Sequence, residues 1–497
     1  MSNVPASRLS LRSLIRNWIS LAGAVIATGS FFAFLLLFAL DIFSEHGNPY
    51  MGILAYVVAP GFLVLGVGLV LVGYWFHLRQ ERRVMADAPP VSLTIDLSRS
   101  RDRKILGVFV AGSVVFLFMT AVGSYQTYQY TESVQFCGRA CHLPMDPEFI
   151  TSQHSPHARV DCVACHVGSG ATAYVKTKIS GMRQLYHLTL NDFDRPIHLN
   201  PDDPGKLRPA RETCEHCHWP QKFTGGFERT FRHYLADEKN TPFSVRLLVN
   251  VGGGDPLRGP VGGIHWHMNI ANKIEYISPD DQQRVIPWIR HTDAKGVVTE
   301  YRNPDFKGDL SKYRIHTMDC IDCHNRPSHN FLSPNDAVDI SFASGRLDPK
   351  IPWLKSKLVE VLAASYTTRD EAMRKIDAVL RADYPKNPEI GTVIAEAQSI
   401  YKSNFFPEMK ADWRSYPDHL SHKNWDGCFR CHDGNHKSAD GKASIKANDC
   451  KSCHLILAQG NDEEMTKLNS KGYDFVHIDS EYSDFSCSGC HTGAKQK

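Results

Sequence analysis

The chain has little net charge and no concentrated positive charge. Its formal net charge is +3 over 497 residues, with 56 Lys and Arg against 53 Asp and Glu. No cluster of Lys and Arg of the size needed to follow a phosphate backbone interrupts this balance. The sequence therefore argues against a nucleic-acid-binding protein. Long apolar runs are missing after about residue 125, so membrane-spanning segments are expected only before it.

No cysteine lies outside one repeated pattern. All 14 cysteines fall into seven motifs in which a His directly follows the second Cys. This is the attachment signal for haem c: the two thiols form thioethers with the haem vinyl groups and the His ligates the iron. A zinc ribbon or a disulfide framework has no reason to place His there each time. The sequence therefore predicts a multihaem c-type cytochrome with seven covalently bound haem c groups.

Six motifs have the spacing C-x-x-C-H, and the first has one extra residue between its cysteines. The predicted attachment residues, in chain order, are Cys137 and Cys141, Cys162 and Cys165, Cys214 and Cys217, Cys320 and Cys323, Cys428 and Cys431, Cys450 and Cys453, and Cys487 and Cys490. The His after each pair is the predicted axial ligand, namely His142, His166, His218, His324, His432, His454 and His491.

Three apolar stretches, at about 18–43, 51–76 and 105–125, are long enough to cross a bilayer core about 30 Å thick. Arg and Lys residues precede the first stretch and separate the second from the third, whereas the loop at 41–51 has none. Positive residues stay in the cytoplasm, so three spans place the N-terminus inside and the C-terminus outside. No cleavage site follows the first stretch, which we interpret as a retained anchor. This topology predicts a protein of the cytoplasmic (inner) membrane whose haem motifs face the periplasm.

These features predict a membrane-anchored multihaem cytochrome c. Three N-terminal transmembrane helices would be followed by a mainly α and irregular haem-stack domain with a small β-rich insertion. The predicted parts are the anchor (1–130), a domain with haems one to three (131–224), the insertion with haem four (225–335), a helical spacer (336–410) and a C-terminal three-haem domain (411–497). Alternating runs at 273–277, 285–289 and 296–301 predict strands, and periodic runs at 353–366, 368–384 and 392–401 predict helices.

Each low-spin haem needs a second axial ligand, usually a His from elsewhere in the chain. The chain has 24 His, more than the motifs and their partners require. Those near a motif are the best candidates: His154, His157, His316, His329, His419, His422, His436 and His477. His265 and His267 lie in a segment that we predict to be a strand, so they would point to opposite sides. His216, inside the third motif, is expected to be exposed.

The region from the third apolar stretch to the third motif resembles the start of the NapC/NirT family of membrane quinol dehydrogenases. The resemblance covers Gly123 to Phe223. It includes YTESVQF before the first motif, Met145 three residues after it, KTKISGMRQLYH at 176–187 and RETCEHCHWPQKF around the third motif. The layout of three spans and seven haems is similar to that of the seven-haem inner-membrane cytochromes of metal-reducing bacteria. The extra residue in the first motif, the two additional spans and the long C-terminal extension depart from the usual family pattern.

The resemblance implies that menaquinol or another quinol is oxidised at the membrane surface and that electrons pass to periplasmic c-type cytochromes. It implies that either His142 or Met145 ligates the first haem, unless Met145 only packs against the porphyrin. The quinol site would lie beside that haem and use charged side chains, with a carboxylate as proton acceptor. The candidates are Lys176, Lys178, Arg183, Asp146 and Glu148, each of which would otherwise face solvent or lipid headgroups.

Two other functions stay open at this point. A terminal reductase would keep one haem open for nitrite, hydroxylamine or a sulfur oxyanion, but no C-x-x-C-K motif marks such a haem. Reversed electron flow into the quinone pool would use the same parts, because direction depends on the haem potentials. The two additional spans would either strengthen the attachment to membrane lipid or mediate homo-oligomerisation.

Overall fold

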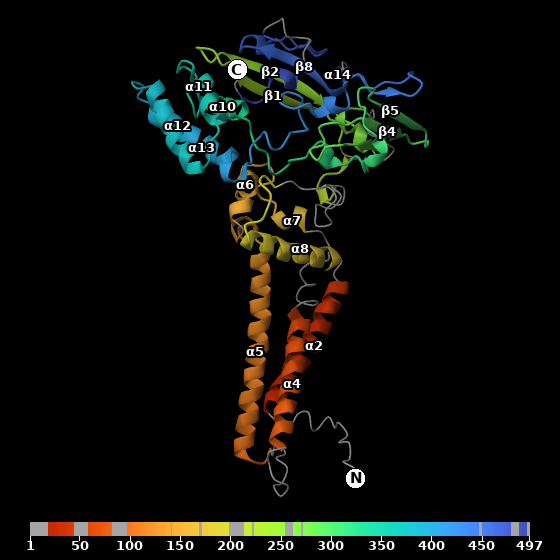
Figure 1. Cartoon of the computed structure of the whole chain (residues 1–497), viewed down its shortest axis with the longest axis vertical. Coiled ribbons are helices and arrows are strands. Elements are labelled where there is room, and N and C mark those ends of the chain that lie inside the picture. Colours follow the sequence, from red (N-terminus) through yellow and green to blue (C-terminus); the bar gives the residue numbers. More distant parts are fainter. Residues whose placement is uncertain are drawn as a thin grey trace. The chain divides into compact units, whose positions relative to one another are not determined.

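The structure is a computed structural model that describes residues 18–43, 58–81, 97–140, 142–167, 171–197, 213–220, 223–253, 262–269, 272–446, 450–478 and 487–494. Figure 1 shows the helices and strands in these ranges. The chain divides into two compact units, Met1–Cys137 with Asp161–Leu190, and Gly138–Val160 with Asn191–Lys497. Each unit is described by itself.

In the first unit, helices α2 (Trp18–Phe43) and α4 (Ala59–Glu81) pack against each other through glycine. A Cβ atom added to Gly23 would lie 2.6 Å from the carbonyl oxygen of Gly66. The two backbones are therefore too close for any side chain at this point. Such contacts between small residues are typical of helices that pair inside a membrane.

Each of the three apolar stretches lies largely in a helix, the third in α5 (Ser100–Glu132). Within the described ranges, only α4 contains a segment that is long and apolar enough to cross a membrane, Ala59–Phe76. A shorter apolar segment, Trp18–Phe34, lies in α2. The structure thus gives one clear candidate span where the sequence predicts three.

The end of α5 leads to the first two motifs. A π-helical turn at Phe136–Ala140 carries the first cysteine of motif one, and the short helix α7 (Cys162–His166) is motif two. Helix α8 (Ala171–Thr189) follows and runs crosswise to α5 in Figure 1. Helix α6 (His142–Gln153), between the two motifs, belongs to the second unit.

The second unit contains an apolar core built by four helices, α10 (Pro334–Ala343), α11 (Leu354–Ala363), α12 (Arg369–Asp383) and α13 (Ile390–Asn404). The core side chains Leu354, Leu358, Ile376 and Leu380 are all 0% exposed. The three helices predicted after residue 353 are confirmed as α11 to α13. No attachment cysteine lies between the fourth and fifth motifs, so this core is made of side chains alone.

The start of α12 shows why the helix begins there. Thr368 is the N-cap, and its hydroxyl oxygen accepts a hydrogen bond from the Glu371 backbone nitrogen at 3.2 Å. The Glu371 carboxylate accepts from the Thr367 backbone nitrogen at 2.9 Å, one residue before the position expected for a capping box.

Two antiparallel sheets complete the unit. The first has the order β1-β2-β8, with β1 at Gly226–Tyr234, β2 at Pro242–Asn250 and β8 at His454–Gly460. The second has the order β6-β3-β4-β5-β7, with β3 at Lys273–Ile277, β4 at Trp288–Thr292, β5 at Val298–Arg302, β6 at Ile315–Thr317 and β7 at Lys437–Ser438. Strands β7 and β8 come from the predicted C-terminal haem domain. Sheet structure therefore extends beyond the predicted insertion, and the five-part division stays a prediction.

The segment around His265 and His267 is not a strand, so that prediction is wrong. It forms the 3-10 helix η4 (Ile264–Met268) directly after Gly263, whose φ is 98°. A Cβ atom at Gly263 would also lie 2.4 Å from the carbonyl oxygen of Asn250. The left-handed backbone and this close approach both require glycine, and they turn the chain out of an extended path.

Truncation of the core in α12 provides a test of the helical packing. Leu380→Ala removes a fully buried side chain, and we expect the free energy of unfolding to fall by about 2–5 kcal/mol because a cavity replaces the lost contacts. Val379→Ala, next to it and 42% exposed, is the matched control and should change little. Thermal melts followed by circular dichroism would measure both, and equal effects would contradict the packing described.

Candidate haem-binding sites

Haem-attachment motifs form short helical turns. Besides α7, these turns are η6 (Cys320–Asp322), η8 (Gly427–Arg430), α14 (Cys450–Cys453) and α15 (Cys487–Cys490). In four motifs the backbone nitrogen of the His donates to the carbonyl oxygen of the first Cys, at 2.8 Å for His218, 2.8 Å for His324, 3.0 Å for His432 and 2.7 Å for His491. One helical turn brings residues three and four apart to the same face. Both thiols and the imidazole of a motif can therefore meet one porphyrin. Cys141 lies outside the described residues.

Five motif His lie opposite a second His from another part of the chain. The distances between ring centres fall between 6.0 and 6.3 Å. The pairs are His218 with His157 at 6.0 Å, His324 with His265 at 6.3 Å, His432 with His267 at 6.0 Å, His454 with His422 at 6.3 Å and His491 with His477 at 6.1 Å.

This distance fits two axial ligands of a single iron. Two imidazole nitrogens that each lie about 2 Å from one metal ion, on opposite sides of it, put their ring centres about 6 Å apart. In every pair, one of the two rings belongs to the His of an attachment motif. The shared spacing in all five pairs therefore fits the haem c that the motifs predict.

Backbone carbonyls orient three of the second His. The Nδ1 atom of His265 lies 2.8 Å from the Val251 oxygen, and that of His267 lies 2.8 Å from the Ile264 oxygen. The Nδ1 atom of His157 lies 3.2 Å from the Pro327 oxygen. A carbonyl oxygen can only accept, so Nδ1 carries the proton in each ring. The lone pair is then on Nε2, which is the arrangement of a metal-ligating His.

Burial keeps most of these rings neutral. It lowers the pKa of seven of them: His265, His267, His324, His422, His432, His454 and His491. Only a neutral imidazole can ligate a metal ion, so the low pKa favours the form that binds. In the pair of His422 and His454, both Nδ1 atoms are buried and have no hydrogen-bond partner. Buried polar atoms without a partner are rare in stable folds.

Several other candidate His are engaged elsewhere. His436 is 0% exposed, with Nδ1 2.8 Å from an Asp433 carboxylate oxygen and Nε2 2.7 Å from the Ile286 carbonyl oxygen. Both of its nitrogens are occupied, so we leave it out of the ligands proposed below. His419 is also buried, its Nε2 lies 3.0 Å from the Gln282 oxygen, and burial lowers its pKa to about 3.

The remaining candidates have other surroundings. His154 is exposed, and the ring of His316 stacks on that of Tyr276 with centres 5.4 Å apart. The Nδ1 atom of His329 lies 2.9 Å from the Glu148 carbonyl oxygen. His216 is exposed, as expected. His154, His316 and His329 stay predictions as ligands.

Neighbouring motifs are joined by their thiols. A side-chain hydrogen bond with Cys137 lowers the pKa of Cys162 to about 7, which links motifs one and two. A side-chain hydrogen bond with Cys320 lowers the pKa of Cys214 to about 7 in the same way, which links motifs three and four. Because these cysteines are the predicted points of attachment, the haems of each linked pair would also be neighbours.

The carboxylates predicted beside a quinol are paired with arginine. Asp146 lies 2.5 Å from the Arg369 guanidinium, and Glu148 lies 3.1 Å from that of Arg326. Met145, on the same helix α6, is half-buried. The three basic candidates, Lys176, Lys178 and Arg183, lie on α8. Arg183 is exposed, and the side chains of the two lysines lie outside the part of the chain that the structure describes.

Comparison with known proteins gives two matches. The sequence model described as NapC/NirT cytochrome c family, N-terminal region, matches residues 99–203. Cytochrome c-type protein ImcH of Geobacter sulfurreducens is 39% identical over 498 residues, which covers 97% of this chain and 96% of that protein. No solved structure matches. The matched range covers most of the segment from Gly123 to Phe223 on which the NapC/NirT resemblance was based, up to residue 203, and together with the relative it confirms the resemblance.

Removal of the two His on η4 provides a test of the ligand pairs. We expect His265→Ala and His267→Ala each to open one haem to carbon monoxide after reduction with dithionite, and the double variant to open two. Different motif His face the two rings, so the effects should add. His216→Ala, an exposed His within a motif, is the control and should leave carbon monoxide binding unchanged. Unaltered spectra in both η4 variants would refute the assignment.

Proposed function

Because this chain belongs to the NapC/NirT-type c-type cytochromes, we propose that it oxidises a quinol, with menaquinol as the leading candidate, at the membrane surface and passes the electrons to periplasmic c-type cytochromes. Covalently bound haem c follows from the family. A total of seven haems, one for each motif, is part of the proposal. Bound haem c would supply reversible one-electron chemistry.

The observation that carries the proposal is the set of five His pairs. A ring on each side of the iron leaves no position for a substrate, so these sites suit electron transfer. A terminal reductase needs an open position, and the pairs argue against one at motifs three to seven. We propose His157, His265, His267, His422 and His477 as the second ligands at motifs three, four, five, six and seven.

The chain also keeps successive motifs close together. Cys137 of motif one lies close to Cys162 of motif two, and Cys214 of motif three lies close to Cys320 of motif four. Helix η4 supplies a His to motif four and another to motif five, from positions two residues apart. The ring of His422, which faces motif six, stacks on Phe429 inside motif five with centres 4.7 Å apart. Close spacing of successive sites supports a relay that follows the order of the motifs.

The membrane part of the proposal rests on the N-terminal helices. We propose three spans, with the N-terminus in the cytoplasm and the haem motifs in the periplasm, as the distribution of Lys and Arg predicts. The glycine contact between α2 and α4 supports a helix pair in lipid. Electrons would then enter next to the membrane, near motifs one and two, and leave from the C-terminal motifs.

We propose a quinol site that involves Lys176, Lys178 and Arg183 of α8, with Met145 or His142 as ligand at motif one. Asp146 is proposed as the proton acceptor, and its ion pair with Arg369 would have to open when a proton arrives. The proposed quinol-site and ligand residues all lie within the range matched by the family model, residues 99–203; Arg369 lies outside it.

Reduction by a menaquinol analogue, added anaerobically and followed at the haem α-band, tests the function. We expect rapid reduction of the wild type and slower reduction of Lys178→Ala and Met145→Ala, because these changes remove a charge from the quinol site and a ligand candidate from the first haem. Gln184→Ala, an exposed change on the same helix α8, is the control and should keep the wild-type rate.

Two outcomes would count against the proposal in different ways. If dithionite reduces the haems but quinol does not, quinol oxidation is wrong, and reversed flow into the quinone pool becomes the better hypothesis. If quinol reduces the wild type and all three variants at one rate, the function stands but the proposed site is wrong.

A further inference from the structure

We infer that Asp336, at the start of helix α10, is a positioning residue that holds the sixth and seventh haem sites in a fixed relation. This inference rests on the proposed function, because it concerns the last two sites of the relay. Asp336 touches no predicted ligand. It binds the segment next to His422, and Asn335, the residue before it, binds the segment next to His491.

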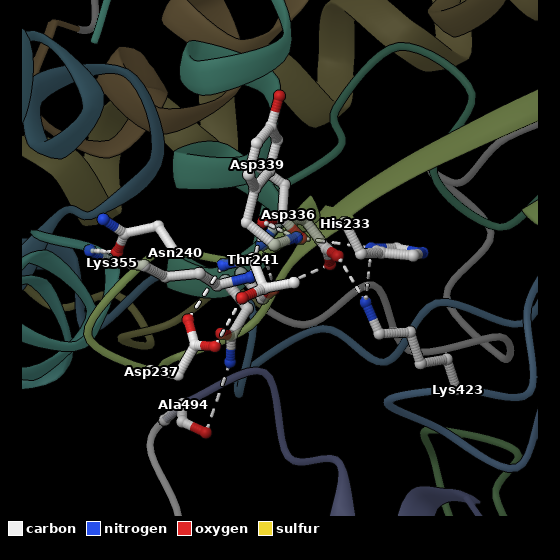
Figure 2. A network of polar contacts seen from close by, with 12 residues as sticks. His233, Asp237, Asn240, Thr241, Asp336, Asp339, Lys355, Lys423 and Ala494 are labelled. Carbon is white, nitrogen blue, oxygen red and sulfur yellow. Dashed lines mark hydrogen bonds and ion pairs between the residues drawn. The ribbon is translucent and has the colours of Figure 1, made fainter. Parts of the chain in front are cut away.

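The first segment is bound by the carboxylate itself. One oxygen of Asp336 lies 3.0 Å from the ammonium of Lys423, and the other accepts a hydrogen bond from the Asn424 amide at 2.9 Å. Figure 2 shows Asp336 and Lys423 joined in this way. Lys423 and Asn424 directly follow His422, which faces the motif His of site six. The carboxylate thus fixes the backbone that carries this ring.

The second segment is bound by Asn335, the residue before Asp336. The backbone nitrogen of Asn335 donates to the Gly493 oxygen at 3.1 Å, and its side-chain amide donates to the Ala494 oxygen at 3.3 Å. Gly493 packs so closely that a Cβ atom there would lie 2.6 Å from the Cβ of Ser333, the N-cap of α10. This segment follows His491, the motif His of site seven. One helix start therefore holds both sites.

Helix α10 is itself fixed one turn further on. The carboxylate of Asp339 accepts from the Tyr234 backbone nitrogen at 3.0 Å and lies 3.1 Å from Nδ1 of His233, both on strand β1. It also pairs with Lys355 of helix α11. Asp339 and Lys355 are only 3% and 4% exposed. These contacts tie the helix to the first sheet and to the apolar core, so it is a rigid support.

The charges in this cluster balance one another. Burial would raise the pKa of Asp336, but the Lys423 ammonium and the Ser333 hydroxyl outweigh it and hold the pKa below its usual value. His233, Asp336 and Asp339 have ligand atoms within 4.8 Å of one another, as a metal site would. The ammonium groups of Lys355 and Lys423 already occupy the carboxylates, however. The cluster is therefore better explained as a structural support than as a cation site.

The test compares two acidic residues in equivalent positions. Asp336 is the third residue of α10 after the N-cap Ser333, and Glu371 is the third residue of α12 after the N-cap Thr368. We expect Asp336→Asn to raise the share of haem that binds carbon monoxide after dithionite reduction by up to one haem in seven, because His422 is no longer held. Glu371→Gln, which has no motif beside it, should leave the share unchanged. Asp336→Glu keeps the negative charge and should raise this share less than Asp336→Asn does.

Lys423→Gln removes the same ion pair from the other side and should reproduce the effect of Asp336→Asn. Wild-type carbon monoxide binding in both variants, with all haems attached, would overturn the inference. Failure of both variants to accumulate, while Glu371→Gln accumulates normally, would also overturn it in favour of a role in folding alone. Dithionite replaces quinol in this experiment, so the result does not depend on whether the protein oxidises quinol.

Discussion

A haem iron held by two His would need one from each side, and the second unit is built in a way that suits this constraint. The motif supplies one His in a short helical turn, and the other must come from a distant segment. His267 faces His432, and His265 faces His324, although His265 and His267 come from one short helix. The sheets make this possible, because β7 and β8 bring the C-terminal motifs against strands that lie far earlier in the chain. Strand β8 even begins with His454, a motif residue.

The four helices α10 to α13 are held together in a different way, by apolar side chains. Their core contains Leu354, Leu358, Ile376 and Leu380 without any attachment cysteine nearby in sequence. Burial of apolar side chains is enough to form it, at about 25 cal/mol for each Å² removed from water. The haem-bearing part has no comparable cluster among its described residues; its second cluster is limited to a few residues such as Ile274 and Tyr276. The unit thus combines a self-sufficient helical core with segments whose arrangement suits haem.

The sequence predicted local features well, because they depend on residues close together in the chain. The motifs and helices α11 to α13 belong to this class. Features that depend on residues far apart in the chain could not be predicted from the sequence. The environment of His436 depends on Asp433 and on a carbonyl oxygen at Ile286, far away in the sequence, and these contacts could not be predicted from proximity to a motif. The segment with His265 and His267 alternates as a strand would, but the backbone of Gly263 starts a 3-10 helix instead. The only sign in the sequence that the chain turns here was the pair of glycines, Gly262 and Gly263, just before the two His and the tryptophan between them.

The buried charges of α10 illustrate why such a protein retains polar contacts that seem costly. A buried ion pair often adds no more stability than apolar side chains of the same volume, because both charges lose their water. It does fix geometry, since Lys355, Asp339 and the backbone of Tyr234 satisfy one another only in a narrow range of positions. Apolar side chains can shift against one another with little loss of stability. Electron transfer between two sites depends on the distance between them, so polar contacts that fix position are favoured next to His422 and His491. The helical core can supply stability through apolar burial, without such polar contacts.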